Sequence, residues 1–101
     1  MKLLLSPLAA DDLHDIHGYI SEELDNPSAA GRLIKDIVKA YKRLKDAPFI
    51  GSPLDAKIDI KTDFRYLVYR GYLIFYKIDN NAVYIYRIIN GRRDYCRILF
   101  R

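Results

Sequence analysis

Arginines and tyrosines of the second half of this sequence are the residues best suited to do chemistry. A planar guanidinium binds phosphate or carboxylate through two hydrogen bonds, and a tyrosine ring offers a face on which a base can stack. Residues 51 to 101 contain ten Lys or Arg and five Asp or Glu, a net charge of +5, while the whole 101-residue chain carries +4. We therefore expect this half to meet an anionic partner. The candidate binding residues are Arg65, Arg70, Arg87, Arg92 and Arg93.

A second interpretation assigns these residues no chemistry. The tyrosines would be half-buried residues of a sheet, and the charges would keep a small domain in solution. Composition supports the two interpretations about equally, so the sequence leaves both open.

Other routes to catalysis lack a sequence basis. His14 and His17 are three residues apart with no strong further ligand set beside them, so we expect ordinary helix-surface histidines, no metal site and no cofactor. The chain has no GxSxG, P-loop, HExxH or Gly-rich dinucleotide motif. Cys96 is the single cysteine, which excludes an intrachain disulfide and suits a reducing cytoplasm. A ribonuclease without metal or histidine stays available, because arginine and lysine can stabilise charge in a transition state.

The start of the sequence, "MKLLLSPLAA", does not fit a signal peptide. The pair Ser6-Pro7 interrupts its apolar run, and Asp11-Asp12 follow at once. No stretch approaches the length of a membrane span. We expect a cytoplasmic protein without membrane contact, built as a single domain over residues 1–101.

Start signals and apolar spacing predict two helices after a short strand at residues 2–5. The pair Ser6-Pro7 supplies a cap and a first-turn proline, and apolar residues spaced by three and four continue to about Leu24. The pair Asn26-Pro27 repeats this signal for a second helix, which runs to about Asp46. Since the connection is short, the two helices should form an antiparallel hairpin.

The rest of the chain changes from helical to strand-like spacing. Residues 47–56 contain two prolines and a glycine, which indicates a loop. An antiparallel meander should follow, with one face accepting the helical hairpin and the face that bears tyrosines and arginines left partly open. Its strands are predicted at residues 64–70, 72–78 and 82–89. The predicted fold class is α+β.

The dipeptide Asn90-Gly91 is typical of a type I′ hairpin turn. Such a turn would lead into a last strand at residues 95–100, in which alternate residues are apolar. It would also aim Arg92 and Arg93 outward from the end of the sheet, where a binding residue is useful.

Five segments, taken in order, resemble the RelE/ParE superfamily of toxins from bacterial type II toxin–antitoxin modules. The resemblance covers nearly the whole chain and implies a strand, a helical hairpin and an antiparallel meander. It also implies a toxin that inhibits growth and a cognate antitoxin that holds it inactive in a hetero-oligomer. The segments are "SPLAADDLHDIHGYI" (6–20), "NPSAAGRLIKDI" (26–37), "LKDAPFIGSPL" (44–54), "FRYLVYRGYLIFYKI" (64–78) and "VYIYRIINGRRDY" (83–95).

Two activities occur on this one fold, so the fold does not choose between them. RelE-like members are ribosome-dependent endoribonucleases that cut mRNA, whereas ParE-like members inhibit DNA gyrase and have no known nuclease chemistry. The segments "NPSAAGRLI" and "YLIFY" and the closing Gly91-x-Arg93-Asp94 are closer to ParE-like members, although Asn90 stands where a histidine is common. DNA gyrase is therefore the leading target and the translating ribosome with its mRNA the alternative. A third interpretation is a non-toxic module that binds nucleic acid or protein.

The RelE-like alternative implies catalytic roles for particular residues. Arg65 or Arg70, together with Arg93, would hold the scissile phosphate, and Tyr95 or Lys61 would assist proton transfer. Val68 stands where RelE-like members carry an arginine, which counts against nuclease activity. For this alternative alone, the candidate catalytic residues are Arg65, Arg93, Tyr95 and Lys61.

For either activity we hypothesise one working surface of tyrosines and arginines around Arg65, Arg87 and Arg93. The tail of the antitoxin would cover this surface, and the cellular target would occupy it in the absence of the antitoxin.

Overall fold

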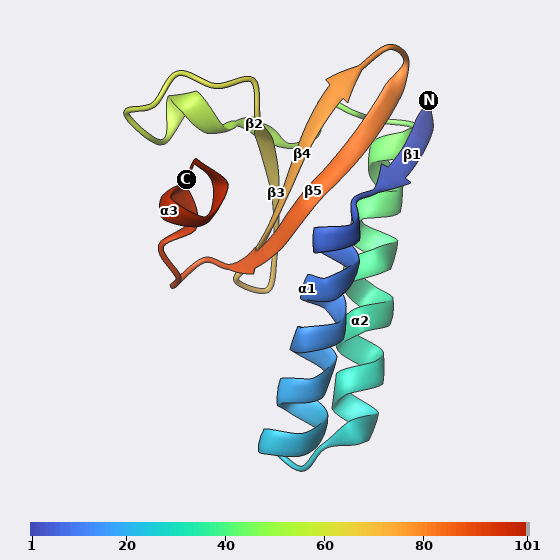
Figure 1. Cartoon of the computed structure of the whole chain (residues 1–101). Coiled ribbons are helices and arrows are strands. Elements are labelled where there is room, and N and C mark those ends of the chain that lie inside the picture. Colours follow the sequence, from blue (N-terminus) through green and yellow to red (C-terminus); the bar gives the residue numbers. More distant parts are fainter. Residues whose placement is uncertain (101) are drawn as a thin grey trace.

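The computed structural model describes residues 1–100, in which two long helices pack on a five-stranded sheet (Figure 1). The strand order is β1-β5-β4-β3-β2, and the α+β fold class predicted from the sequence is confirmed. The helices are α1 (Pro7–Gly18), α2 (Pro27–Lys42) and the short α3 (Tyr95–Leu99). The strands are β1 (Lys2–Leu5), β2 (Ser52–Pro53), β3 (Arg65–Tyr69), β4 (Tyr72–Asp79) and β5 (Ala82–Asn90).

Both predicted helix starts are confirmed by their caps. The Ala9 N–H donates to Ser6 Oγ at 3.0 Å, and the Ala29 N–H donates to Asn26 Oδ1 at 3.2 Å, with a proline in the first turn of each helix. A π-helical turn, Tyr19–Glu23, extends α1, and α2 returns beside it as the second arm of an antiparallel hairpin (Figure 1). Within residues 1–100 no helix combines the length and the apolar character needed to cross a bilayer.

The predicted meander of β3, β4 and β5 is confirmed, and its two turns explain the tight connections. Arg70 and Gly71 have φ values of 47° and 83°, and Asn80 and Asn81 have φ values of 47° and 60°. Two successive residues with positive φ are what a type I′ turn requires, and this turn matches the twist of paired strands. The sheet as a whole is mixed, because β1 pairs in parallel with β5 at one edge.

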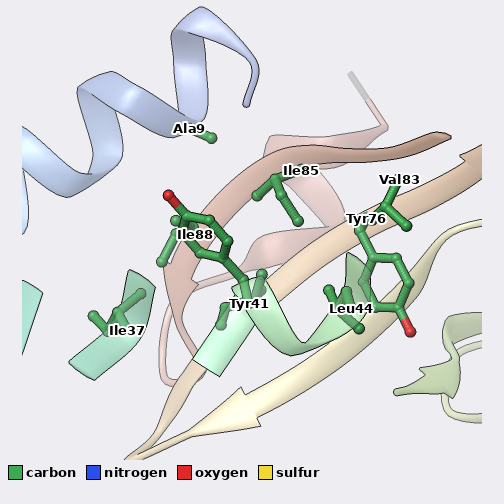
Figure 2. Close-up of a cluster of buried hydrophobic side chains, with 9 residues drawn as sticks. Ala9, Ile37, Tyr41, Leu44, Tyr76, Val83, Ile85 and Ile88 are labelled. Carbon is green, nitrogen blue, oxygen red and sulfur yellow. The ribbon is translucent and has the colours of Figure 1, made fainter. Parts of the chain in front are cut away.

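One face of the sheet forms the larger core with α1 and α2 (Figure 2). Ile74 and Tyr76 of β4 and Val83, Ile85 and Ile88 of β5 point toward the helices. They meet buried side chains of the helical half, which are Ala9, Ile37, Tyr41 and Leu44. Burying an aliphatic side chain of this size stabilises a fold by about 1.5–3 kcal/mol. The helical stripes predicted from spacing therefore have the partner surface that they need.

The other face of the sheet is covered by the C-terminal helix, where the sequence had predicted a strand. That prediction for residues 95–100 was wrong. Asp94 caps α3 by accepting from the Arg97 N–H at 3.3 Å. Three apolar side chains at helical spacing, Tyr95, Ile98 and Leu99, then pack on a second core; its buried residues are Leu54, Phe64, Leu73, Phe75 and Ile89. A helix lets them all face the same sheet surface, whereas a strand would turn Ile98 and Leu99 to opposite sides.

The segment predicted as a loop, residues 47–56, is partly regular. The two residues of β2 pair antiparallel with β3, and a 3-10 turn, Leu54–Ala56, follows. Leu54 is fully buried in the second core. This apolar anchor holds the segment against the sheet.

Candidate binding groove at the end of the sheet

Asp12 of α1 and Arg87 of β5 form a buried ion pair with two hydrogen bonds. Arg87 Nε donates to Asp12 Oδ2 and Arg87 Nη2 donates to Asp12 Oδ1, both at 2.8 Å. The Ile88 N–H donates to the same Oδ2 at 2.9 Å. The hydrogen bond with Asp12 raises the pKa of Arg87, and this effect exceeds the lowering by burial. Arg87, predicted as a binding residue, is thus charged but neutralised by its own chain.

The path of β5 explains why Arg87 reaches α1. Phe75 is paired with Arg87 while Tyr76 is paired with Ile85, so Tyr86 is an extra residue in β5 and the strand bulges. A bulge changes the direction of neighbouring side chains. Beyond the end of β1, Ser6 covers the edge of β5: its N–H donates to the Ile85 carbonyl at 2.9 Å and its hydroxyl to the Tyr86 carbonyl at 2.7 Å.

The residues after β5 form an ordered turn rather than the predicted type I′ turn. The Gly91 N–H donates to the Gly71 carbonyl at 2.8 Å, so β5 stays against the β3–β4 turn. The Arg92 N–H donates to Asn90 Oδ1 at 2.9 Å and the Arg93 N–H to the Asn90 carbonyl at 3.0 Å. A Cβ at position 91 would lie 3.2 Å from the Gly71 carbonyl oxygen, so any larger residue would require this contact to widen by a few tenths of an ångström. Asn90 thus sets the position of Arg93.

Two hollows adjoin at Arg93. The first, here named the arginine hollow, has a volume of about 390 Å³ and is lined by Arg87, Arg93, Asp94, Arg97 and Ile98. The second, named the tyrosine hollow, has a volume of about 300 Å³; its lining residues are Asp12, Asp15, Ile16, Tyr19, Tyr72, Ile88, Asn90 and Arg93. We call the two together the Arg93 groove. It extends from α1, past the end of β5, to α3.

The arginine hollow keeps positive charge that its own chain does not neutralise. Within residues 1–100 the ion pairs are Arg87 with Asp12 and Lys77 with Asp63. Arg93 and Arg97 are exposed and have no carboxylate of residues 1–100 within 4.0 Å of their guanidinium groups. Asp94, the acidic lining residue, uses Oδ1 to cap α3. The hollow can therefore accept an anionic group through Arg93 and Arg97.

The tyrosine hollow has an apolar and aromatic wall. Tyr19 is 58% exposed, which is unusual for a large aromatic ring. Ile16 is partly buried and Ile88 is buried in the same wall. Burial raises the pKa of Tyr72, and the nearby Tyr19 raises it further. Tyr19 and Tyr72 are therefore close enough to interact electrostatically.

Arg65, predicted as part of the same surface, lies elsewhere. Its Nη2 donates to the Gly51 carbonyl at 2.6 Å, its Nε donates to the Tyr76 hydroxyl at 3.4 Å, and its guanidinium lies over the Phe49 ring at 5.1 Å. The Tyr76 hydroxyl donates in turn to the Pro48 carbonyl at 2.7 Å. We name Arg65, Tyr76 and residues 48–51 the Arg65 clamp. Its contacts hold the segment after α2 against the sheet.

The structure does not bring Arg65 and Arg93 together. Arg65 and Ile85 both pair with Tyr76, and Ile85 is five residues before Asn90 in β5. One of these five residues, Tyr86, is the bulge, so four paired positions remain, and at about 3.3 Å per residue they span roughly 13 Å along the sheet before Arg93 is reached. Arg65 also lines a different hollow, with Phe49, Phe64 and Ile78.

Gly51→Ala is expected to lower the free energy of unfolding by about 1–3 kcal/mol. A Cβ at this position would lie 2.5 Å from the Tyr76 hydroxyl and 2.6 Å from the Tyr66 carbonyl oxygen, inside the Arg65 clamp. Gly31→Ala is the matched control, because Gly31 is exposed in α2 with nothing within 4 Å of a Cβ, and alanine should stabilise the helix there by up to about 1 kcal/mol. Urea denaturation measures both, and equal effects would contradict the tight packing of the clamp.

The other predicted site residues are dispersed. Tyr95 packs on Phe75 with ring centroids 5.3 Å apart and belongs to the second core. Lys61 is exposed in the segment between the 3-10 turn and β3, beside Asp55 and Asp59. Arg70 is exposed in the β3–β4 turn, with its guanidinium 5.8 Å from the centre of the Tyr69 ring. Arg92 is exposed in the turn before α3.

Of the residues that line the Arg93 groove, only Arg87 and Arg93 were predicted as site residues; those that were not include Asp12, Tyr19, Tyr72 and Arg97. A sequence signal existed for Arg97 alone. Asp94 is a good helix cap, and Tyr95, Ile98 and Leu99 have helical spacing. The sequence could therefore have predicted a helix with Arg97 on its outer side. Asp12, Tyr19 and Tyr72 come together through the packing of α1 on β4 and β5, which no local pattern indicates.

Comparison with known proteins assigns the family. The family model of the ParE toxin of the type II toxin–antitoxin system parDE matches residues 3–95. A solved structure described as a chromosomal ParDE TA system from P. aeruginosa has the same fold, with a TM-score of 0.76 at 23% sequence identity, over 89% of this chain and 95% of that chain. No curated protein sequence is significantly similar. The chain therefore belongs to the family of ParE toxins of type II toxin–antitoxin systems.

Proposed function

We propose that this protein is a growth-inhibiting toxin that acts on DNA gyrase in the cytoplasm, and that a cognate antitoxin binds it and neutralises it. Membership of the ParE toxin family supports this, because ParE-like members of the superfamily are gyrase inhibitors. The binding site that we propose is centred on Arg93 and Arg97, because no carboxylate of residues 1–100 forms an ion pair with either arginine. A protein partner with acidic side chains would find its complement there.

The RelE-like nuclease alternative has less support. It requires Arg65 or Arg70, together with Arg93, to hold one scissile phosphate, and Tyr95 or Lys61 to assist proton transfer at it. Arg65 instead donates to the Gly51 carbonyl, Tyr95 packs on Phe75, and the register separates Arg65 from the end of β5 by roughly 13 Å along the sheet. Groups that stabilise a transition state must converge on the reacting atoms. We therefore propose inhibition by binding rather than phosphodiester cleavage.

Neutralisation by competition follows from the same site. If the antitoxin tail occupies the Arg93 groove, it covers Arg93 and Arg97 and denies them to gyrase. Antitoxin and gyrase would then bind this protein in turn and not together. The resting form would be the hetero-oligomer with the antitoxin.

A supercoiling assay tests the function directly. Purified protein added to gyrase, ATP and relaxed plasmid should block supercoiling in a dose-dependent way, and addition to a cell-free translation system should leave protein synthesis and mRNA length unchanged. mRNA cleavage with normal supercoiling would overturn the gyrase proposal in favour of the nuclease. Induced expression that neither stops growth nor raises DNA-damage signalling would instead favour the non-toxic binding module.

A further inference from the structure

The Arg93 groove has two chemically different halves that share one residue. The arginine hollow offers Arg93 and Arg97 as donors to an anion, since Arg87 is already paired with Asp12. The tyrosine hollow offers the exposed Tyr19 ring, with Tyr72 and Ile16 beside it. Arg93 lines both hollows, so a ligand held by Arg93 has a cationic pocket on one side and an apolar, aromatic pocket on the other.

The carboxylates around the groove limit what can occupy it. Asp15 lines the tyrosine hollow, and the exposed Asp11 is close enough to raise the pKa of Arg87 through its charge. A nucleic-acid strand carries roughly one phosphate per 3.4 Å, so a strand leaving the arginine hollow toward Tyr19 would place further phosphates beside these carboxylates. A ligand with one negative group followed by an apolar group avoids this repulsion.

We propose that the Arg93 groove binds a segment of a partner protein in which an acidic side chain and a large apolar side chain lie on the same face. The acidic side chain binds Arg93 and Arg97, and the apolar side chain packs on Tyr19, Ile16 and Tyr72. That the partner is a protein rests on the proposed function. The inference adds the chemical groups by which the groove recognises that partner.

Two hollows with a common wall fit neighbouring side chains of one segment. In an extended segment residues i and i+2 lie on one side, about 7 Å apart. In a helix residues i and i+3 or i+4 are neighbours at about 5–6 Å. The smallest probe that presents both groups is therefore an extended tripeptide with the acidic and apolar residues at its ends.

The binding probe is the capped peptide acetyl-Glu-Gly-Leu-amide, titrated into the ¹⁵N-labelled full chain while backbone and arginine side-chain NMR signals are followed. Its matched controls are acetyl-Gln-Gly-Leu-amide, which lacks the charge, and acetyl-Glu-Gly-Ala-amide, which lacks the large apolar group. We expect signals of Asn90, Arg93, Arg97 and Tyr19 to shift with the first peptide. The Gln peptide should bind about tenfold more weakly and the Ala peptide about fivefold more weakly.

Substitutions at two exposed residues, Arg97 and Tyr19, test the two halves of the groove separately. In Arg97→Ala the preference for Glu over Gln should fall while the preference for Leu over Ala persists. In Tyr19→Ala the reverse is expected, because Tyr19 lines only the tyrosine hollow. Arg32→Ala removes the same charge as Arg97→Ala from an exposed position in α2 and should change neither preference. Both groove residues are exposed, so their replacement leaves the cores intact.

Three outcomes would overturn the inference: no shift of groove signals up to the solubility limit of the probe, equal binding of the Glu and Gln peptides, or loss of both preferences in either single variant. A thymidine dinucleotide that shifts the same signals at lower concentration than the peptide would assign the groove to nucleic acid instead. If the peptide binds but the protein does not inhibit gyrase, the groove is a peptide-binding site and only the proposed target is rejected. Failure of the inference and failure of the proposed function are therefore distinguishable.

Discussion

Asp12→Ala is expected to lower the free energy of unfolding by about 3–5 kcal/mol, as urea denaturation would measure. Asp12 is 7% exposed, and its carboxylate accepts three hydrogen bonds, two from Arg87 and one from the Ile88 N–H. Removing it leaves the guanidinium of Arg87 partly buried without a counter-charge and the Ile88 N–H without an acceptor. Both are costly because desolvated donors lose their hydrogen bonds to water.

Asp11→Ala is the matched control for this experiment. Asp11 is the neighbouring acidic residue in α1 and is exposed, so its replacement changes the charge and helix propensity equally but should alter stability by no more than about 0.5 kcal/mol. The double substitution Asp12→Leu with Arg87→Met should lower the free energy of unfolding less than Asp12→Ala alone, since it removes both charges together. A loss under about 1 kcal/mol for Asp12→Ala would mean that the pair behaves as an exposed one and does not tie α1 to β5.

Arg93→Ala is expected to raise the concentration of protein needed for half-inhibition of gyrase supercoiling about tenfold or more. Arginines at the centre of an interface often contribute at least 2 kcal/mol, which corresponds to such a change. Arg93 is the one residue that lines both hollows, and its position is set by the hydrogen bond of its N–H to the Asn90 carbonyl. The same variant should be less toxic when its expression is induced.

Arg32→Ala and Arg93→Lys complete this test. Arg32 is exposed in α2, away from the groove, and its replacement controls for the loss of one positive charge. Lysine at position 93 keeps the charge but cannot form two parallel hydrogen bonds, so partial inhibition is expected. Since Arg93 is exposed, its replacement should change the midpoint of urea denaturation little. If Arg93→Ala inhibits gyrase as strongly as Arg32→Ala, Arg93 is not part of the surface that contacts gyrase.

The starts of the helices and the strands of the meander were predictable because their causes are local. Ser6-Pro7 and Asn26-Pro27 each place a side-chain acceptor beside the first free N–H groups of a helix. The richness of "YLIFYKI" and "AVYIYRII" in Tyr, Phe, Ile and Val needs no distant information either. Such patterns specify where an element lies.

The C-terminal segment shows where local patterns fail. Residues 95–100 have apolar side chains at both strand-like and helical spacing, so period alone does not choose between them. The choice depends on a surface to cover. Phe75 and Ile89 leave an apolar face on the side of the sheet away from α1, and α3 presents Tyr95, Ile98 and Leu99 to it together. That requirement becomes visible when β4 and β5 are paired.

By itself the sequence determined an α+β fold with a basic second half, because caps, periodicity and net charge are local or additive properties. The likeness to RelE/ParE toxins came from the resemblance of five segments in order. The sequence presented Arg65, Arg87 and Arg93 as three equivalent cations. Tertiary structure alone separated them: Arg65 donates to a carbonyl 14 residues away and Arg87 to a carboxylate 75 residues away, while Arg93 has no carboxylate partner in residues 1–100. An arginine is available to a partner only when its own fold leaves it unpaired, and pairing is decided by contacts distant in sequence.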